Sequence, residues 1–212
     1  MYVRLVIATV NEGSSVDDLL SYVVETAMPS FDGKEGLLTF AAMKVSDSNM
    51  LTWTTWANKD VRYAADETMK QAVGGAKEFL AGPPEILEGD LIASKTFLDQ
   101  HPIPFYARFV VGAGVKEGKT YEDVGEWLQN SVYKTYETLD GIVGAAGVKV
   151  DESKGFSYNF WTDETAYEKG KEVVSSVTAE AVENLIESAP TEYVGECSIW
   201  KTYPDFGKQT EN

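Results

Sequence analysis

The sequence predicts an α+β fold in which two β-α-β-β-α-β units follow one another and pack their antiparallel sheets together as a pseudo-dimeric barrel within one chain. Three observations predict it. The 212 residues repeat themselves at a nearly constant offset, each half holds short runs of alternating apolar and polar residues, and helical apolar spacing separates those runs. One such sheet, covered by helices on one face only, leaves an apolar face that a second sheet can bury.

The repeat runs along the whole chain. Residues 2–7, YVRLVI, return as residues 106–111, YARFVV, at an offset of 104. Gly89-Asp90 returns as Gly195-Glu196 at an offset of 106. Because the offset changes by so little, the halves are expected to differ by small loop changes and to keep the same elements.

The repeat also gives the predicted domain boundaries. Residues 1–97 form the first repeat, residues 98–104 form a linker stiffened by two prolines, and residues 105–204 form the second repeat. Residues 205–212 are predicted to be a flexible C-terminal tail.

The first half begins with a strand over 2–10, where β-favouring residues alternate with polar ones. A helix is predicted to start after Ser14-Ser15, because a serine oxygen caps free N–H groups and Asp17-Asp18 favour the positive end of a helix. The apolar residues of this helix recur at helical spacing: Val16, Leu19, Leu20, Val23 and Val24.

A hairpin and a second helix complete the first half. Strands are predicted over 37–45 and 50–56, and the polar residues between them suit a tight turn. A helix over 60–81 and a strand over 87–97 follow.

The second half repeats this order. Thr120 followed by Glu122-Asp123 marks the start of its first helix, in which Val124, Leu128 and Val132 recur at helical spacing. The remaining elements are strands over 106–115, 142–150, 155–161 and 194–203, and a helix over 163–188.

Composition excludes several functional classes. The formal net charge of −16 and the pI near 4.4 disfavour nucleic acid and anionic membranes as partners. A lone cysteine, Cys197, and a lone histidine, His101, exclude an intrachain disulfide, a thiolate zinc cluster and chemistry that needs two histidines. No metal site and no cofactor are expected.

The N-terminal run over 1–7 is too short for a membrane span and contains Arg4. It lacks the small-residue cleavage site of a signal peptide. The protein is therefore expected in the cytoplasm.

Two tyrosine–arginine pairs occupy equivalent positions in the first strand of each half. Alternation places Tyr2 and Arg4 on one face of their strand, and Tyr106 and Arg108 on one face of theirs. The more apolar set is expected to pack on the helices, which would turn both pairs toward the barrel interior or its mouth. Each arginine then either forms a structural ion pair or binds an anionic or phenolate ligand.

Tryptophans and cap residues have structural interpretations. Trp53, Trp56 and Trp161 on or beside strands are predicted to be core residues, although Trp53 is also a candidate ligand contact. Asn58 and Asp163 are predicted to cap the second helix of each half.

The strand-to-helix segments carry a family resemblance. Residues 56–60, WANKD, and 160–167, FWTDETAY, together with the tandem ferredoxin-like units, resemble the dimeric α+β barrel superfamily and within it the antibiotic biosynthesis monooxygenase (ABM) group. The second half matches that group's tryptophan, acid, alanine and tyrosine pattern. In the first half Arg62 stands where Tyr167 stands in the second.

The resemblance implies an apolar pocket in which an electron-rich aromatic compound reacts with oxygen without metal or flavin. An asparagine, a tryptophan and a tyrosine are the helpers that such proteins use. The candidate catalytic residues are Trp56, Asn58, Tyr158, Asn159, Trp161 and Tyr167. Haem degradation, another activity of the group, is disfavoured because the only histidine lies in the linker and not on a helix.

The resulting hypothesis is a small-molecule-binding barrel that acts as a cofactor-independent monooxygenase on an aromatic, polyketide-like or quinol compound. The alternative is a non-catalytic ligand-binding or stress-related protein with the same fold. Under either hypothesis the expected partner is a small apolar or aromatic molecule. The chain is expected to be a monomeric pseudo-dimer or a homodimer.

Overall fold

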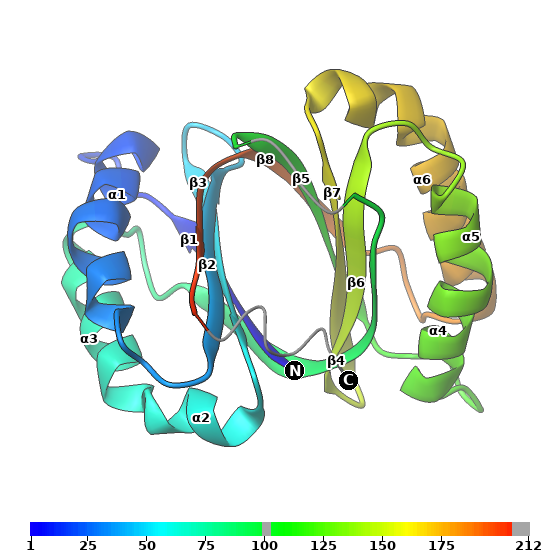
Figure 1. The fold of residues 1–212 in the computed structure, drawn as a ribbon, viewed down its shortest axis with the longest axis horizontal. Helices are drawn as coiled ribbons and strands as arrows, with labels where there is room; N and C mark the ends of the chain where they lie inside the picture. The colour runs from blue at the N-terminus through cyan, green and yellow to red at the C-terminus, as the bar shows by residue number, and fades with distance from the viewer. Residues whose placement is uncertain (99–102, 205–212) are drawn as a thin grey trace. The chain divides into compact units, whose positions relative to one another are not determined.

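The computed structural model describes residues 1–98 and 103–204, apart from the side chain of Ala113 (Figure 1). His101 and the predicted tail over 205–212 lie outside the described residues. The chain divides into two compact units. Unit 1 comprises Met1–Glu88 and the chain from Cys197 onward, and unit 2 comprises Gly89–Glu196.

Unit 1 is an antiparallel sheet covered by helices on one face (Figure 1). Strand β3 lies between β1 and β2, and Trp56 at the end of β3 is paired with both Tyr2 and Leu37. The elements are β1 (Tyr2–Thr9), α1 (Val16–Tyr22), β2 (Leu37–Lys44), β3 (Asn49–Trp56), α2 (Lys59–Ala64) and α3 (Asp66–Gly75).

Unit 2 has the same arrangement. Strand β7 lies between β5 and β6, and Trp161 at its end is paired with both Tyr106 and Ile142. The elements are β5 (Phe105–Ala113), α4 (Tyr121–Trp127), α5 (Tyr133–Tyr136), β6 (Ile142–Asp151), β7 (Lys154–Trp161) and α6 (Glu164–Asn184).

Two long strands belong to both units. β4 (Glu85–Thr96) starts in unit 1 and continues in unit 2, and β8 (Thr191–Thr202) does the converse. In hydrogen-bonded order the strands are β1-β3-β2-β8-β5-β7-β6-β4, and this order closes on itself. The α+β topology with a closed antiparallel strand order confirms the predicted fold class.

The predicted caps explain where the helices begin. Ser15 and Asp18 form a capping box at α1, with Ser15 Oγ accepting from the Asp18 N–H at 3.1 Å. Thr120 and Asp123 form the same box at α4. Each box satisfies N–H groups that the first helical turn leaves free.

Asn58 and Asp163 cap α2 and α6 as predicted. Asn58 Oδ1 accepts from the Val61 N–H at 3.1 Å, and Asp163 Oδ1 accepts from the Ala166 N–H at 2.8 Å. Both residues have extended backbone, as N-cap residues do.

The helices differ from the prediction in two respects. The predicted helix over 60–81 is interrupted at Ala65, whose backbone leaves the helical region, and a short 3-10 turn over Ala76–Phe79 ends it. A π-helical turn also extends the first helix of each unit, over Val23–Ala27 and over Leu128–Val132. Neither feature follows from apolar spacing, because periodicity does not distinguish between turn types.

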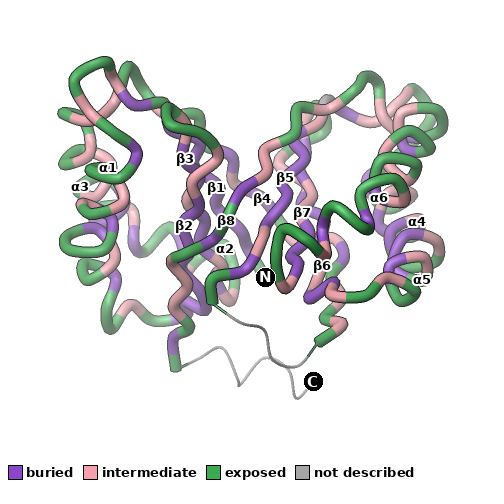
Figure 2. The backbone as a smooth tube through the Cα atoms, turned by 90° about the horizontal axis from the view of Figure 1, so that it is seen from above, coloured by how far each residue is buried: buried purple, intermediate pink, exposed green. Residues whose placement is uncertain are grey.

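Each unit has its own core between its sheet and its helices. Figure 2 shows buried residues along the strands and exposed residues along the outer sides of α1 and α3. Trp56 and Trp161 are fully buried in these cores, as predicted. Trp56 Nε1 donates to Thr54 Oγ1 at 2.9 Å, and Trp161 Nε1 donates to Asn159 Oδ1 at 2.7 Å.

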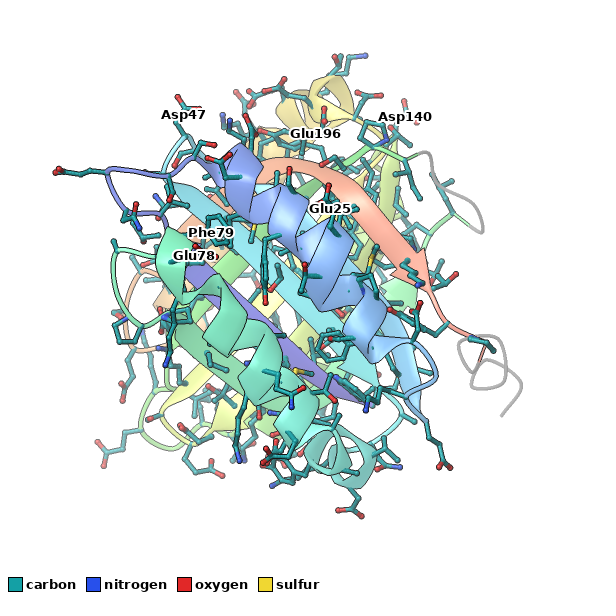
Figure 3. All side chains as sticks on the ribbon, turned by 90° about the vertical axis from the view of Figure 1, so that its left-hand side faces the viewer. Glu25, Asp47, Glu78, Phe79, Asp140 and Glu196 are labelled. Atoms are coloured by element: carbon teal, nitrogen blue, oxygen red, sulfur yellow. The ribbon has the colours of Figure 1, made fainter. Side chains whose placement is uncertain are left out.

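The surface of unit 1 carries exposed acids. Figure 3, in which the helices of this unit face the viewer, shows Glu25 and Glu78 on the helical layer and Asp47 in the turn between β2 and β3. Within residues 1–98 and 103–204, no helix is long and apolar enough to cross a membrane.

Candidate functional site

Each unit holds a cavity between its sheet and its helices. The unit 1 cavity has a volume of about 70 Å³ and the unit 2 cavity about 100 Å³. In unit 1 the walls come from the first helix and α3, and in unit 2 from α4, α5 and α6. Both walls are mainly apolar, which is typical of small-molecule sites.

The tyrosine–arginine faces of β1 and β5 point to the opposite side from the one predicted. Arg4 lines the unit 1 cavity together with Leu19 and Met69 of the helices, and Arg108 lines the unit 2 cavity. The expectation that Tyr2, Arg4, Tyr106 and Arg108 face the barrel interior is therefore wrong. Its premise fails because the first seven residues of β1 are all buried, so relative polarity does not identify the helix-facing side.

Both arginines form ion pairs within the protein, which is the first of the two alternatives predicted for them. Arg4 Nε lies 2.8 Å from Glu88 Oε1, and the same carboxylate accepts a hydrogen bond of 3.0 Å from Arg62 Nε. Burial lowers the pKa of Arg4, and Glu88 opposes that shift. Arg108 is 2% exposed, and its Nε donates to Glu192 Oε2 at 3.2 Å.

The floors of the two cavities differ at equivalent positions of the strand register. Gly112 is paired with Gly155 in unit 2, where Ala8 is paired with Met50 in unit 1. Gly147 of β6 likewise lines the unit 2 cavity, where Ala42 holds the same register position in unit 1. Of these glycines, Gly112 faces open space, because an added Cβ would meet atoms only at 3.8 Å or beyond, whereas Leu128 and Tyr121 occupy the space over Gly147 and Gly155.

Two tyrosines are among the residues that line the unit 2 cavity. Tyr121, the first residue of α4, is 5% exposed, and its hydroxyl has no hydrogen-bond partner among the described residues. Tyr136 lines the same cavity from α5. Burial raises the pKa of each phenol to about 12, so both are neutral hydrogen-bonding groups near pH 7.

Five predicted site residues meet beside this cavity. The rings of Tyr106 and Tyr167 lie 5.2 Å apart, and Tyr167 lies 6.0 Å from Trp161. Trp161 is bonded to Asn159, which is paired with Arg108 in the strand register. Burial raises the pKa of Tyr106 and Tyr167, which excludes them as bases at neutral pH.

The other candidates lie elsewhere. Asn58 is an exposed cap residue, and Trp56 belongs to the unit 1 core. Trp53 is among the residues that line the unit 1 cavity, and its ring lies 6.3 Å from Trp200. Tyr158 stacks on Phe160, whose ring is 5.0 Å away, and alternation places it on the face of β7 opposite to Asn159.

Several residues of the unit 2 site were not predicted from the sequence. They include Tyr121, Tyr136, Thr178 and Glu192. A signal exists in the difference between the halves: by register and repeat, Tyr121 and Tyr136 stand where Val16 and Phe31 stand in the first half. Their significance depends on the cavity, which no local pattern reveals.

The raised tyrosine pKa values predict a loss of stability at high pH. An unfolded tyrosine ionises near pH 10, so the contribution of neutral Tyr121 is complete below pH 10 and is lost as the pH rises toward about 12. Tyr121→Phe should flatten the decline in the urea midpoint between pH 10 and pH 12. The exposed Tyr63→Phe should leave the decline unchanged, and equal curves for all three proteins would contradict the assignment.

Comparison with known proteins identifies the fold. No protein-family model matches the chain, and no curated protein matches it. A Lactobacillus acidophilus protein provisionally named a monooxygenase superposes with a TM-score of 0.71 at 11% identity, covering 95% of both chains. An anthrone oxidase-like protein gives 0.69 at 13% identity, covering 97% of this chain and 94% of the other.

A third structure makes the fold explicit. A Listeria monocytogenes ferredoxin-fold protein, described as related to antibiotic biosynthesis monooxygenases, gives a TM-score of 0.53 at 14% identity, with 92% and 93% of the chains covered. At such identities the likeness shows the fold alone. The fold is that of the ABM-like ferredoxin-fold proteins, which confirms the resemblance at that level.

Proposed function

We propose that unit 2 binds a small oxygen-bearing aromatic compound in its sheet–helix cavity and oxygenates it with dioxygen, without a cofactor. The observation that carries the proposal is the glycine-lined cavity, whose mainly apolar walls also include Tyr121 and Arg108. Related folds support it, because some of the similar structures are named as monooxygenases or as anthrone oxidase-like. The proposal also includes that the protein acts in the cytoplasm, as a monomer or a homodimer.

The cavity volume restricts the substrate. An engineered cavity of about 150 Å³ holds one benzene ring, so a cavity of about 100 Å³ suits a single ring after small side-chain shifts. A quinol fits this limit, whereas a polycyclic compound requires the helices to move away from the sheet.

The chemistry proposed for a quinol needs few protein groups. Loss of a proton makes the ring electron-rich enough to pass an electron to dioxygen, and a buried donor stabilises the resulting oxyanion. In this proposal Arg108 and Tyr121, which line the cavity, are the donors, and Glu192, the carboxylate hydrogen-bonded to Arg108, is the proton acceptor. One oxygen atom enters the ring and the other leaves as water, while the quinol becomes a hydroxyquinone.

Non-catalytic binding is the second candidate, and one observation favours it. Several polar side chains of the site already hydrogen-bond within the protein. Arg108 donates to Glu192 and Thr178, and Trp161 donates to Asn159. With the pKa of each nearby tyrosine raised, the site holds no phenol that titrates near pH 7. Such a site can hold a ring without reacting with it.

A titration separates these candidates. Hydroquinone should quench tryptophan fluorescence saturably, since Trp127 lines the cavity. Gly112→Ala adds a methyl group that meets only atoms at 3.8 Å or beyond, so the variant should fold normally and bind about tenfold more weakly. Gly74→Ala, which adds the same group in open space in unit 1, is the control.

Oxygen consumption decides between oxygenation and binding. Uptake of dioxygen that requires hydroquinone and falls in Gly112→Ala supports the oxygenase. Saturable binding without uptake supports the binder, and equal binding by Gly112→Ala and wild type places the ligand outside this cavity.

A further inference from the structure

The hydroxyl of Tyr121 has no structural use in unit 2. Its oxygen is buried at the start of α4 and has no hydrogen-bond partner among the described residues, and Tyr121 is one of the residues that line the cavity. The half-buried Lys149 ammonium lies 5.4 Å from the centroid of its ring and pairs with Glu152. A phenylalanine would fill the same space without burying an unbonded hydroxyl, which is unfavourable for stability.

The sheet makes room for this phenol. A side chain at Gly155 would meet the Tyr121 ring at 2.8 Å and its hydroxyl at 2.9 Å, closer than real Cβ atoms come. The equivalent pair in unit 1, Val16 and Met50, has neither the hydroxyl nor the gap. Tyr121 and Gly155 are therefore matched to each other in the unit that has the larger cavity.

The strand register sets the extent of the site. Tyr121 lies over Gly155 at one end, and Arg108 is paired with Asn159 four residues further along β7. At about 3.3 Å per residue the two floor positions are about 13 Å apart. This span is longer than a single aromatic ring, so the site has room for one ring between Tyr121 and Arg108.

We infer that Tyr121 is the specificity-determining residue of the unit 2 cavity, and that its hydroxyl bonds the oxygen substituent of a single-ring phenol or quinol. The inference rests on the proposed function, because Tyr121 lies at one end of the same cavity. It assigns recognition of the ligand's oxygen substituent to that end. It predicts selection against hydrocarbon rings of equal size.

The test compares 4-fluorophenol with 4-fluorotoluene by ¹⁹F NMR line broadening. Tyr121→Phe should bind 4-fluorophenol about tenfold more weakly than wild type does, because the variant loses one neutral hydrogen bond to the ligand. Affinity for 4-fluorotoluene should stay within about twofold. Tyr133→Phe is the matched control, because its hydroxyl is also buried without a partner among the described residues but does not line the cavity.

The outcomes separate the two proposals. A tenfold loss for the phenol alone, absent in Tyr133→Phe, supports the inference. If Tyr121→Phe changes the affinity for both ligands equally, the inference about Tyr121 is overturned. The cavity is then still a binding site, but the Tyr121 hydroxyl bonds water and not the ligand. Failure of both ligands to bind wild type overturns the cavity proposal together with the inference, and melting curves check that each variant folds.

Discussion

Replacing Trp161 with alanine is expected to lower the free energy of unfolding by about 3–5 kcal/mol. The indole is fully buried, packs 6.0 Å from the ring of Tyr167 and donates to Asn159 at 2.7 Å. Gly170 of α6 has no side chain where the indole lies, so the helix packs directly on the ring. Truncation therefore opens a cavity and also leaves the buried Asn159 amide without its donor.

Urea unfolding followed by circular dichroism measures this loss. Trp161→Phe is the control, since it keeps an aromatic ring and loses only the indole N–H and some volume, for a cost of about 1–2 kcal/mol. A loss below about 1.5 kcal/mol for Trp161→Ala would show that the core of unit 2 refills the space.

The features that sequence predicted best are those with a local physical cause. Ser15 and Asn58 cap helices because a short polar side chain reaches N–H groups two or three residues ahead. Trp56 and Trp161 end strands at equivalent places and are buried in both units. The repeat then carried each assignment from one half to the other.

The facing of β1 and β5 could not be predicted in this way. Alternation correctly grouped Tyr2 with Arg4, but the helix-facing side depends on where the charge partners lie. Glu88 and Glu192 stand on β4 and β8, far from the arginines in sequence. The preference for apolar residues under helices gives way when a carboxylate neutralises the guanidinium.

The candidate site was predicted only in part. Asn159, Trp161 and Tyr167 do meet, because they flank one strand end and the helix that follows it. Tyr121 reads locally as an ordinary first residue of a helix. Its place in a cavity depends on Gly155, which approaches it only once the β5–β7 and β6–β7 registers are set.

Glu88→Gln is the second change with a large expected effect, a loss of about 3–5 kcal/mol in the free energy of unfolding. The Glu88 side chain is 17% exposed and lies between two buried guanidiniums, those of Arg4 and Arg62. Arg62 keeps a second partner in Asp66, whereas Arg4 pairs only with Glu88 among the ion pairs of the described residues. Removing the carboxylate charge leaves Arg4 buried and uncompensated.

Two further variants test that cause. Arg4→Met combined with Glu88→Gln should recover about half of the loss, because the double variant no longer buries an unpaired charge. Glu192→Gln in unit 2 should cost less than Glu88→Gln, since the Glu192 side chain is 39% exposed and Thr178 still bonds the guanidinium of Arg108. Among the described residues, Glu192 pairs with one arginine, whereas Glu88 pairs with two. If the double variant is no more stable than Glu88→Gln alone, the loss comes from packing of the Glu88 side chain, and charge burial does not explain why β4 carries an acid under the helices of unit 1.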